Sequence, residues 1–183
     1  MMKHILGIFL LIVISTAPCW AQADGVQRVE AVYGSRVYTL SLPQGWQQLE
    51  LRQEKEFSPV LLRLAGPDGI NKGAVYLQRF PRQQMSLEDY KSAARSYIQE
   101  TMKGQLLSQA DVTIAGQKAW RSQYEGNGPG FVDAKRRFQN TVLFDGDSII
   151  VVHCAAPPEL WEKLKPSFDS ISQSLSASER RNE

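Results

Sequence analysis

The chain contains few of the residues that form cross-links and metal sites. Its 183 residues include two cysteines, Cys19 and Cys154, and two histidines, His4 and His153. If the segment that carries Cys19 and His4 is removed after export, no internal disulfide can form, and a histidine-based metal site or a Ser-His-Asp triad is hard to build from one imidazole. We therefore expect no metal and no cofactor, and a fold that depends on its apolar core.

An excess of one charge is also absent. Lys and Arg number 21 against 19 for Asp and Glu, which gives a formal net charge of +2 at pH 7. This balance gives no case for nucleic acid or an anionic membrane surface as the partner. Any electrostatic binding site must therefore be local.

An apolar run at the start of the chain has the features of a secretory signal. Lys3 precedes the apolar run Ile5–Ile14, which is too short to span a bilayer, and Ala21-Gln22-Ala23 offers small residues at the positions that signal peptidase reads. We predict that residues 1–23 are a signal peptide cleaved after Ala23. The mature chain would begin at Asp24, contain no transmembrane span and reside in the periplasm.

Cys19 raises the alternative of a lipid anchor. Lipoprotein processing would need a small, flexible residue directly before the cysteine, whereas Pro18 has a fixed φ and a rigid ring. The sequence therefore favours removal of Cys19 with the signal over lipidation at Cys19.

The rest of the chain is expected to form one domain. It contains no repeat, no low-complexity block and no linker long enough to divide it. A chain of about 160 residues can bury roughly 70% of its unfolded surface without disulfides. We place the domain at residues 24–176 and a polar tail at residues 177–183.

Hydrophobic periodicity predicts strands, a helix, more strands and a closing helix. Ser86 and Asp89 have the spacing of a capping box, and Gly104 ends the helix that follows. Ile149–Val152 is apolar at every position, as in a central strand covered on both faces. The expected strands are 37–42, 60–65, 74–80, 111–114, 118–125, 131–144 and 148–155, and the second helix is 158–175.

Three short motifs mark particular points of this pattern. They are Leu42-Pro43 followed by Gly45-Trp46, Ile114-Ala115-Gly116 followed by Ala119, and Phe168 with Ile171 in the last helix. With the order of elements, they resemble the PsbP-like superfamily, which includes the bacterial periplasmic DcrB-type proteins. The resemblance implies an α+β fold, an α/β sandwich with helices packed on an antiparallel sheet. It also implies a protein that is not an enzyme, because members mostly act as binding, assembly or chaperone factors without a shared catalytic residue set.

Candidate catalytic residues are sparse. His153 and Cys154 are neighbours on a strand, so their side chains point to opposite faces and cannot form a dyad. Cys154 is expected to be a small buried residue and His153 a strand residue near the sheet end. The remaining enzymatic alternative is a hydrolase with a carboxylate/serine site built from Asp133, Asp145 and Ser148.

Three cations are candidates for binding a partner. Alternation in 131–144 places Lys135 and Arg137 on the polar face of the strand, with Arg121 beside them on a neighbouring strand. An ordinary solvated sheet face, or an edge that discourages strand pairing, explains the same residues. Arg136 falls on the apolar face, where we expect its stem to pack while its head reaches water.

Two functional hypotheses follow. The first is an exported, non-catalytic binding, assembly or chaperone-like factor that presents the sheet face, or a groove beside a helix, to an envelope protein, peptide or lipid. The second is the carboxylate/serine hydrolase. A deep pocket with two convergent carboxylates would favour the enzyme, and an open apolar groove with a charged rim would favour the binding factor.

Overall fold

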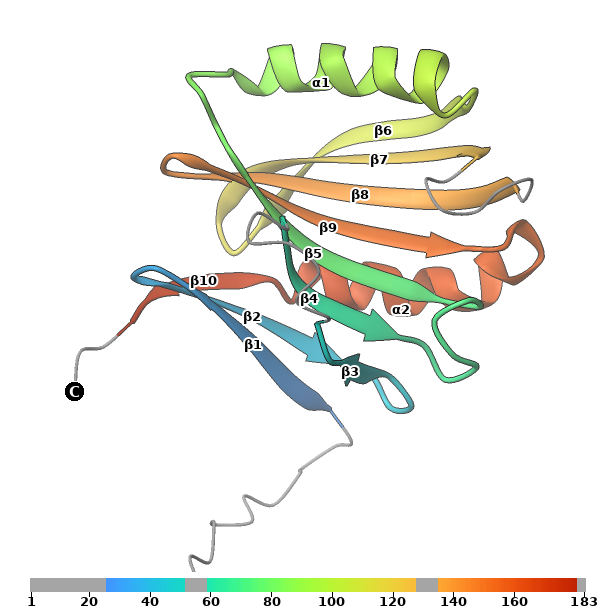
Figure 1. The fold of residues 1–183 in the computed structure, drawn as a ribbon, viewed down its shortest axis with the longest axis horizontal. Helices are drawn as coiled ribbons and strands as arrows, with labels where there is room; N and C mark the ends of the chain where they lie inside the picture. Colours follow the sequence, from blue (N-terminus) through green and yellow to red (C-terminus); the bar gives the residue numbers. More distant parts are fainter. Residues whose placement is uncertain (1–25, 52–58, 128–134, 181–183) are drawn as a thin grey trace, which may run out of the picture.

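The computed structural model describes residues 26–51, 59–127 and 135–180 (Figure 1). Within these ranges the chain alternates between strands and a few helices. In chain order they are β1 Gln27–Tyr33, β2 Arg36–Leu42, β3 Gln47–Leu49, β4 Val60–Ala65, β5 Ala74–Pro81, α1 Leu87–Ser96, the π-helical turn η2 Tyr97–Thr101, β6 Gln105–Ile114, β7 Gln117–Asn127, β8 Lys135–Asp145, β9 Ser148–Ala156, the 3₁₀ turn η3 Pro158–Leu160, α2 Trp161–Gln173 and β10 Ser176–Glu179.

The strands form two antiparallel sheets, as expected for the α+β class. A seven-stranded sheet has the order β3-β4-β5-β9-β8-β7-β6, and a three-stranded sheet has the order β1-β2-β10. Strand β9 lies in the middle of the large sheet, between β5 and β8. Ile149–Val152 is buried there, which confirms the prediction of a central strand covered on both faces.

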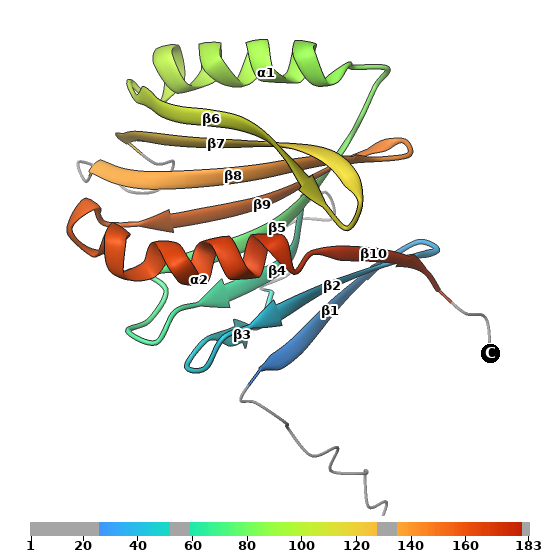
Figure 2. The same ribbon diagram turned by 180° about the vertical axis from the view of Figure 1, so that it is seen from behind.

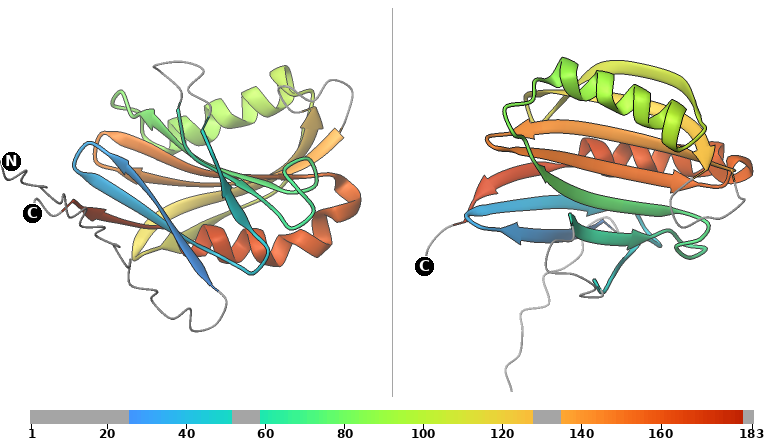
Figure 3. Two further views of the ribbon diagram at one scale, coloured as in Figure 1. Left: turned by 60° about the horizontal axis from the view of Figure 1, so that its bottom comes forward. Right: turned by 45° about the horizontal axis from the view of Figure 1, so that its top comes forward.

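The large sheet is covered differently on its two faces. Helix α2 and the three-stranded sheet pack on one face, around a core that includes Leu40, Leu77, Ile150 and Phe168 (Figure 2). Helix α1 lies along the other face, and its side chains pack on β7, β8 and β9 in two smaller clusters (Figure 3). Successive residues of β9 point to opposite faces of the sheet, so alternate side chains pack against α1 and against α2.

The first helix begins where the capping box predicts. The Ser86 hydroxyl accepts a hydrogen bond from the Asp89 backbone N–H at 3.1 Å, and the Asp89 carboxylate accepts from the Ser86 backbone N–H at 3.1 Å. The pair satisfies two of the backbone donors that a helix start leaves unpaired. The predicted helix, which ends at Gly104, also covers η2, but the periodicity does not predict the π-helical form of this turn.

The ends of the chain contribute more strands than expected. β1 and β10 flank β2, with Val29 opposite Leu40 and Ala177 opposite Tyr38. The predicted boundary at residue 176 is therefore corrected, because residues 177–179 pair with β2 instead of leaving the fold as a tail. Hydrophobic periodicity does not detect β10, because this strand is polar and pairs through its backbone. β1 buries only Val29 and Ala31, which is too few for a clear period.

Candidate functional site

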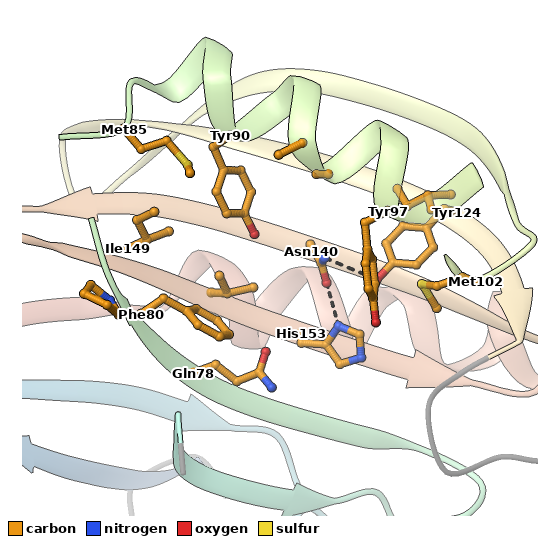
Figure 4. Close-up of a pocket in the computed structure, with 15 residues that line it drawn as sticks. Gln78, Phe80, Met85, Tyr90, Tyr97, Met102, Tyr124, Asn140, Ile149 and His153 are labelled. Atoms are coloured by element: carbon orange, nitrogen blue, oxygen red, sulfur yellow. Dashed lines mark hydrogen bonds between the residues drawn. The ribbon is translucent and has the colours of Figure 1, made fainter. Parts of the chain in front are cut away.

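A cavity of about 570 Å³ opens between α1 and the large sheet (Figure 4). Strands β5, β7, β8 and β9 contribute to its floor, and α1 and η2 form its wall. Its volume falls within the range of about 300–1,000 Å³ that is typical of small-molecule sites. Most of its lining is apolar, including Phe80, Met85, Ile98, Met102, Ile149 and Val151. We call this cavity the α1 pocket.

The π-helical turn shapes one end of the α1 pocket. The Met102 backbone N–H donates to the Tyr97 carbonyl at 3.1 Å, five residues back in place of the usual four. Tyr97, Ile98 and Met102 of this segment all line the pocket. The apolar stripe on the predicted helix includes these three residues. The sequence indicates that they pack in the core, and it does not indicate that they line a cavity.

Two glycines bring the end of this turn against β7. A Cβ atom at Gly104 would lie 2.5 Å from the carbonyl oxygen of Glu125, and the Cα atom of Gly104 lies 3.0 Å from where a Cβ of Gly126 would be. The Asn127 backbone N–H also donates to the Met102 carbonyl at 3.0 Å. Without side chains at Gly104 and Gly126, the backbones meet closely, and this anchors the wall of the pocket.

A short hydrogen-bonded chain of polar side chains lies on the floor. The Asn140 amide nitrogen donates to the Tyr124 hydroxyl at 3.2 Å, and its amide oxygen lies 2.7 Å from Nδ1 of His153. The amide oxygen is an acceptor, so Nδ1 of His153 carries the proton. The other ring nitrogen, Nε2, is then an acceptor, and within the described part of the chain no side chain donates to it.

Burial keeps these groups uncharged. It lowers the pKa of His153 to about 4 and raises the pKa of Tyr90 to about 12. The His153 ring also packs against Phe138 and Tyr76, with ring centroids 5.4 Å and 6.1 Å away. The pocket therefore presents neutral polar atoms at physiological pH.

His153 and Cys154 lie on opposite faces, as predicted. Cys154 is fully buried on the α2 side, with its sulfur 3.8 Å from the Ser172 hydroxyl, and burial raises its thiol pKa to about 12. A thiol with such a pKa is a poor nucleophile. The position of His153 differs from the expectation, because it lies on the central strand between Tyr76 and Asn140 and faces the α1 pocket.

The structure describes two of the three residues of the carboxylate/serine alternative, Asp145 and Ser148. Asp133 lies outside the described residues. Asp145 and Ser148 face each other across the β8–β9 hairpin. The Asp145 carboxylate accepts hydrogen bonds from Arg36 and Tyr38, and the Ser148 hydroxyl accepts from Arg79 at 2.9 Å. Both side chains thus take part in contacts that join strands.

The three candidate cations do not form an open basic patch. Arg121 and Arg137 share a face, as predicted, but it is the face that α2 covers. Arg121 pairs with Asp169 at 3.2 Å, and Arg137 pairs with Glu125 at 3.2 Å and Glu162 at 3.5 Å. Lys135 is exposed at the start of β8. Binding of a partner by these cations stays a prediction, and it must compete with these ion pairs.

Arg136 also differs from expectation. It is buried, and its guanidinium donates to the carbonyl oxygen of Asn71 at 2.8 Å. Its head is therefore held by the loop between β4 and β5, where we expected it to reach water.

Within residues 26–51, 59–127 and 135–180, no three His, Cys, Asp or Glu side chains are grouped to hold a metal ion. Over the same ranges, no helix has the length and apolar character needed to cross a membrane.

Comparisons with known proteins show the fold. No family model and no curated protein matches the chain. Cyanobacterial PsbP (CyanoP) from Synechocystis sp. PCC 6803 is similar with a TM-score of 0.64 and 12% identity, over 90% of this chain and 99% of that one. LpqN, involved in cell envelope biogenesis of Mycobacterium tuberculosis, has a TM-score of 0.58 and 13% identity, over 84% of this chain and 91% of that one.

A third similar structure is the Ran-binding protein Mog1p of Saccharomyces cerevisiae. Its TM-score is 0.51 and its identity 11%, over 84% of this chain and 96% of that one. At such identities the likenesses show a PsbP/Mog1-like α+β fold and leave the function open. The predicted fold is confirmed, whereas the narrower DcrB-type assignment stays a prediction.

Proposed function

We propose that this chain is an exported, non-catalytic binding factor of the cell envelope that holds an apolar ligand, or an apolar part of a protein, peptide or lipid partner, in the α1 pocket. The observation that carries the proposal is the lining of that pocket. None of its 15 described lining residues is Asp, Glu, Lys or Arg. An apolar cavity with a few neutral polar groups suits binding, and it lacks the convergent carboxylates expected of a hydrolase.

The structural neighbours support the two other parts of the proposal. LpqN is involved in cell envelope biogenesis, and Mog1p binds Ran, so this fold occurs in an envelope factor and in a protein-binding factor. The signal-like segment at residues 1–23 supports export, and the DcrB-type resemblance supports a periplasmic location.

Processing of the exported chain is the first test. We expect intact-mass analysis of the protein from a bacterial envelope fraction to give a chain that begins at Asp24, because Ala21-Gln22-Ala23 provides the cleavage site. Cys19→Ser should be processed in the same way. A mature chain that begins at Cys19 and carries acyl chains, or a Cys19→Ser variant that fails to mature, would contradict soluble export and indicate a lipoprotein.

Filling the α1 pocket is the second test. Ala94 lies on α1, lines the pocket and packs toward the sheet, so the larger side chain of Ala94→Trp must enter the cavity. We expect the wild-type chain to bind the neutral apolar dye N-phenyl-1-naphthylamine saturably. In Ala94→Trp the affinity should fall about tenfold or more, since burial of one ring of the dye is worth about 1.5–3 kcal/mol.

The matched control is Ser92→Trp. Ser92 is exposed on the same helix and is not among the lining residues, so the dye should bind this variant as it binds the wild type. Thermal melts of both variants show whether they keep the fold. Equal dye binding by the wild type and a folded Ala94→Trp would place the binding elsewhere and contradict the proposal.

A further inference from the structure

We infer that the α1 pocket binds an uncharged amphiphile with a hydroxyl group, an alcohol or a phenol, whose O–H donates a hydrogen bond to Nε2 of His153. This inference rests on the proposed function and specifies the chemistry of its ligand. It depends on an unpaired acceptor at the floor of an apolar cavity that is open to a small molecule.

The orientation of the His153 imidazole follows from its neighbours. The amide nitrogen of Asn140 is used by the Tyr124 hydroxyl, which leaves the amide oxygen to face Nδ1 of His153 at 2.7 Å. The proton therefore resides on Nδ1, and the lone pair of Nε2 is available. Figure 4 shows the imidazole beside Asn140 at the floor of the pocket. His153 is half-buried and lines the pocket, so a ligand that covers it also removes Nε2 from water. An acceptor that loses water without gaining a donor is costly, so a ligand that supplies the donor is favoured over one that does not.

The ligand is expected to be uncharged. Burial lowers the pKa of His153 to about 4, so the imidazole is neutral at physiological pH and offers no positive charge to an anion. The described lining contains no Lys or Arg that could take that role. A carboxylate would lose its hydration in this cavity without gaining a counter-charge.

A hydroxyl group, which both donates and accepts hydrogen bonds, suits the pocket better than a group that only donates. Tyr90 projects its hydroxyl from α1 toward the sheet, and Gln78 carries its amide on β5 (Figure 4). Neither group has a side-chain hydrogen bond to another described residue. The oxygen of an alcohol or phenol can donate to His153 and accept from one of these groups, while its carbon body contacts the apolar lining.

Three probes of similar shape separate these contributions. They are 4-pentylphenol, its methyl ether 4-pentylanisole, which lacks the donor, and 4-pentylbenzoate, which is an anion. We expect calorimetry to show that the phenol binds the wild type about three- to tenfold more tightly than the ether, the gain that one hydrogen bond supplies, and that the benzoate binds most weakly. In His153→Phe, which keeps a ring but removes the acceptor, phenol and ether should bind equally.

Tyr76→Phe is the matched control. It removes a hydroxyl from a side chain that packs on His153 but is not among the lining residues, and it should keep the preference for the phenol. Equal affinity of the wild type for phenol and ether, or a preference that persists in His153→Phe, would overturn the inference and leave the proposed function standing. Failure of phenol, ether and dye alike to bind the wild type would overturn both.

A spectroscopic measurement keeps the inference testable if His153→Phe does not fold. In the His4→Gln variant, His153 gives the one remaining imidazole signal. Long-range ¹H–¹⁵N spectra should show Nδ1 protonated and Nε2 as the unprotonated nitrogen, and 4-pentylphenol should shift Nε2 while 4-pentylanisole should not. A proton on Nε2, or identical spectra with the two probes, would overturn the inference.

Discussion

Phe168→Ala is expected to lower the free energy of unfolding by about 3 to 5 kcal/mol, the usual cost of removing a large aromatic side chain from a core. Phe168 is fully buried on α2, and its ring lies 5.7 Å from the ring of Trp46 and 5.4 Å from that of Trp161. Trp161 lies on α2 itself, whereas the contact with Trp46 joins α2 to the chain that follows β2. Truncation therefore leaves a cavity between layers that neighbouring side chains cannot readily fill.

Chemical denaturation of Phe168→Ala beside Lys163→Ala measures this effect. Lys163 is on the same helix and its side chain is 69% exposed, so its truncation should change the stability by about 0.5 kcal/mol or less. A loss of under about 1 kcal/mol in Phe168→Ala would mean that α2 does not pack against the sheets through this residue.

The elements that the sequence predicts well are those whose burial is visible in their own periodicity. Tyr38, Leu40 and Leu42 alternate with partly exposed residues on β2, and the capping box marks the start of α1. β10 has no such pattern, because it pairs with β2 through the backbone and its side chains stay largely exposed. β1 buries two side chains, Val29 and Ala31, which is too few for a clear period.

The candidate site was predictable in its parts but not as a pocket. The apolar stripe of α1 and the position of His153 on a strand could be read from the sequence. Whether such a stripe fills the space above the sheet or leaves a cavity depends on how far the helix stands from the strands, which periodicity does not give. Nor does it give the π-helical turn η2 or the close approach of Gly104 and Gly126 that brings the end of this turn against β7. Arg121 and Arg137 illustrate the same limit, because periodicity gave their common face but not the helix whose Asp169 and Glu162 cover it.

A partly buried ion pair joins the small sheet to the large one. Arg36 on β2 donates to both carboxylate oxygens of Asp145 at the end of β8, with its Nε 2.9 Å from Oδ2, and the Tyr38 hydroxyl donates to the same oxygen at 3.0 Å. The Asp145 side chain is 7% exposed and that of Arg36 is 33% exposed. Removal of the carboxylate would leave a partly desolvated guanidinium and a buried hydroxyl without this acceptor.

Asp145→Ala is therefore expected to lower the free energy of unfolding by about 2 to 4 kcal/mol at pH 7. This is somewhat less than the cost of breaking a fully buried pair, because water reaches and screens part of Arg36. Asp147→Ala is the matched control, since Asp147 is exposed in the same hairpin turn and should change the stability little. Equal stability of the two variants would show that the ion pair does not hold the sheets together.

The stabilisation by Asp145 should also depend on pH in one direction. The hydrogen bonds from Arg36, and then that from Tyr38, hold the pKa of Asp145 below its ordinary value. The unfolded chain then binds the proton more readily than the folded chain, so the contribution is complete above the ordinary pKa of about 4 and is lost as the pH falls below it. Urea unfolding between pH 7 and pH 2.5 should therefore show the stability of the wild type converging on that of Asp145→Ala at the acid end. A constant difference between the two proteins over this range would contradict the lowered pKa and leave packing alone as the cause of the loss.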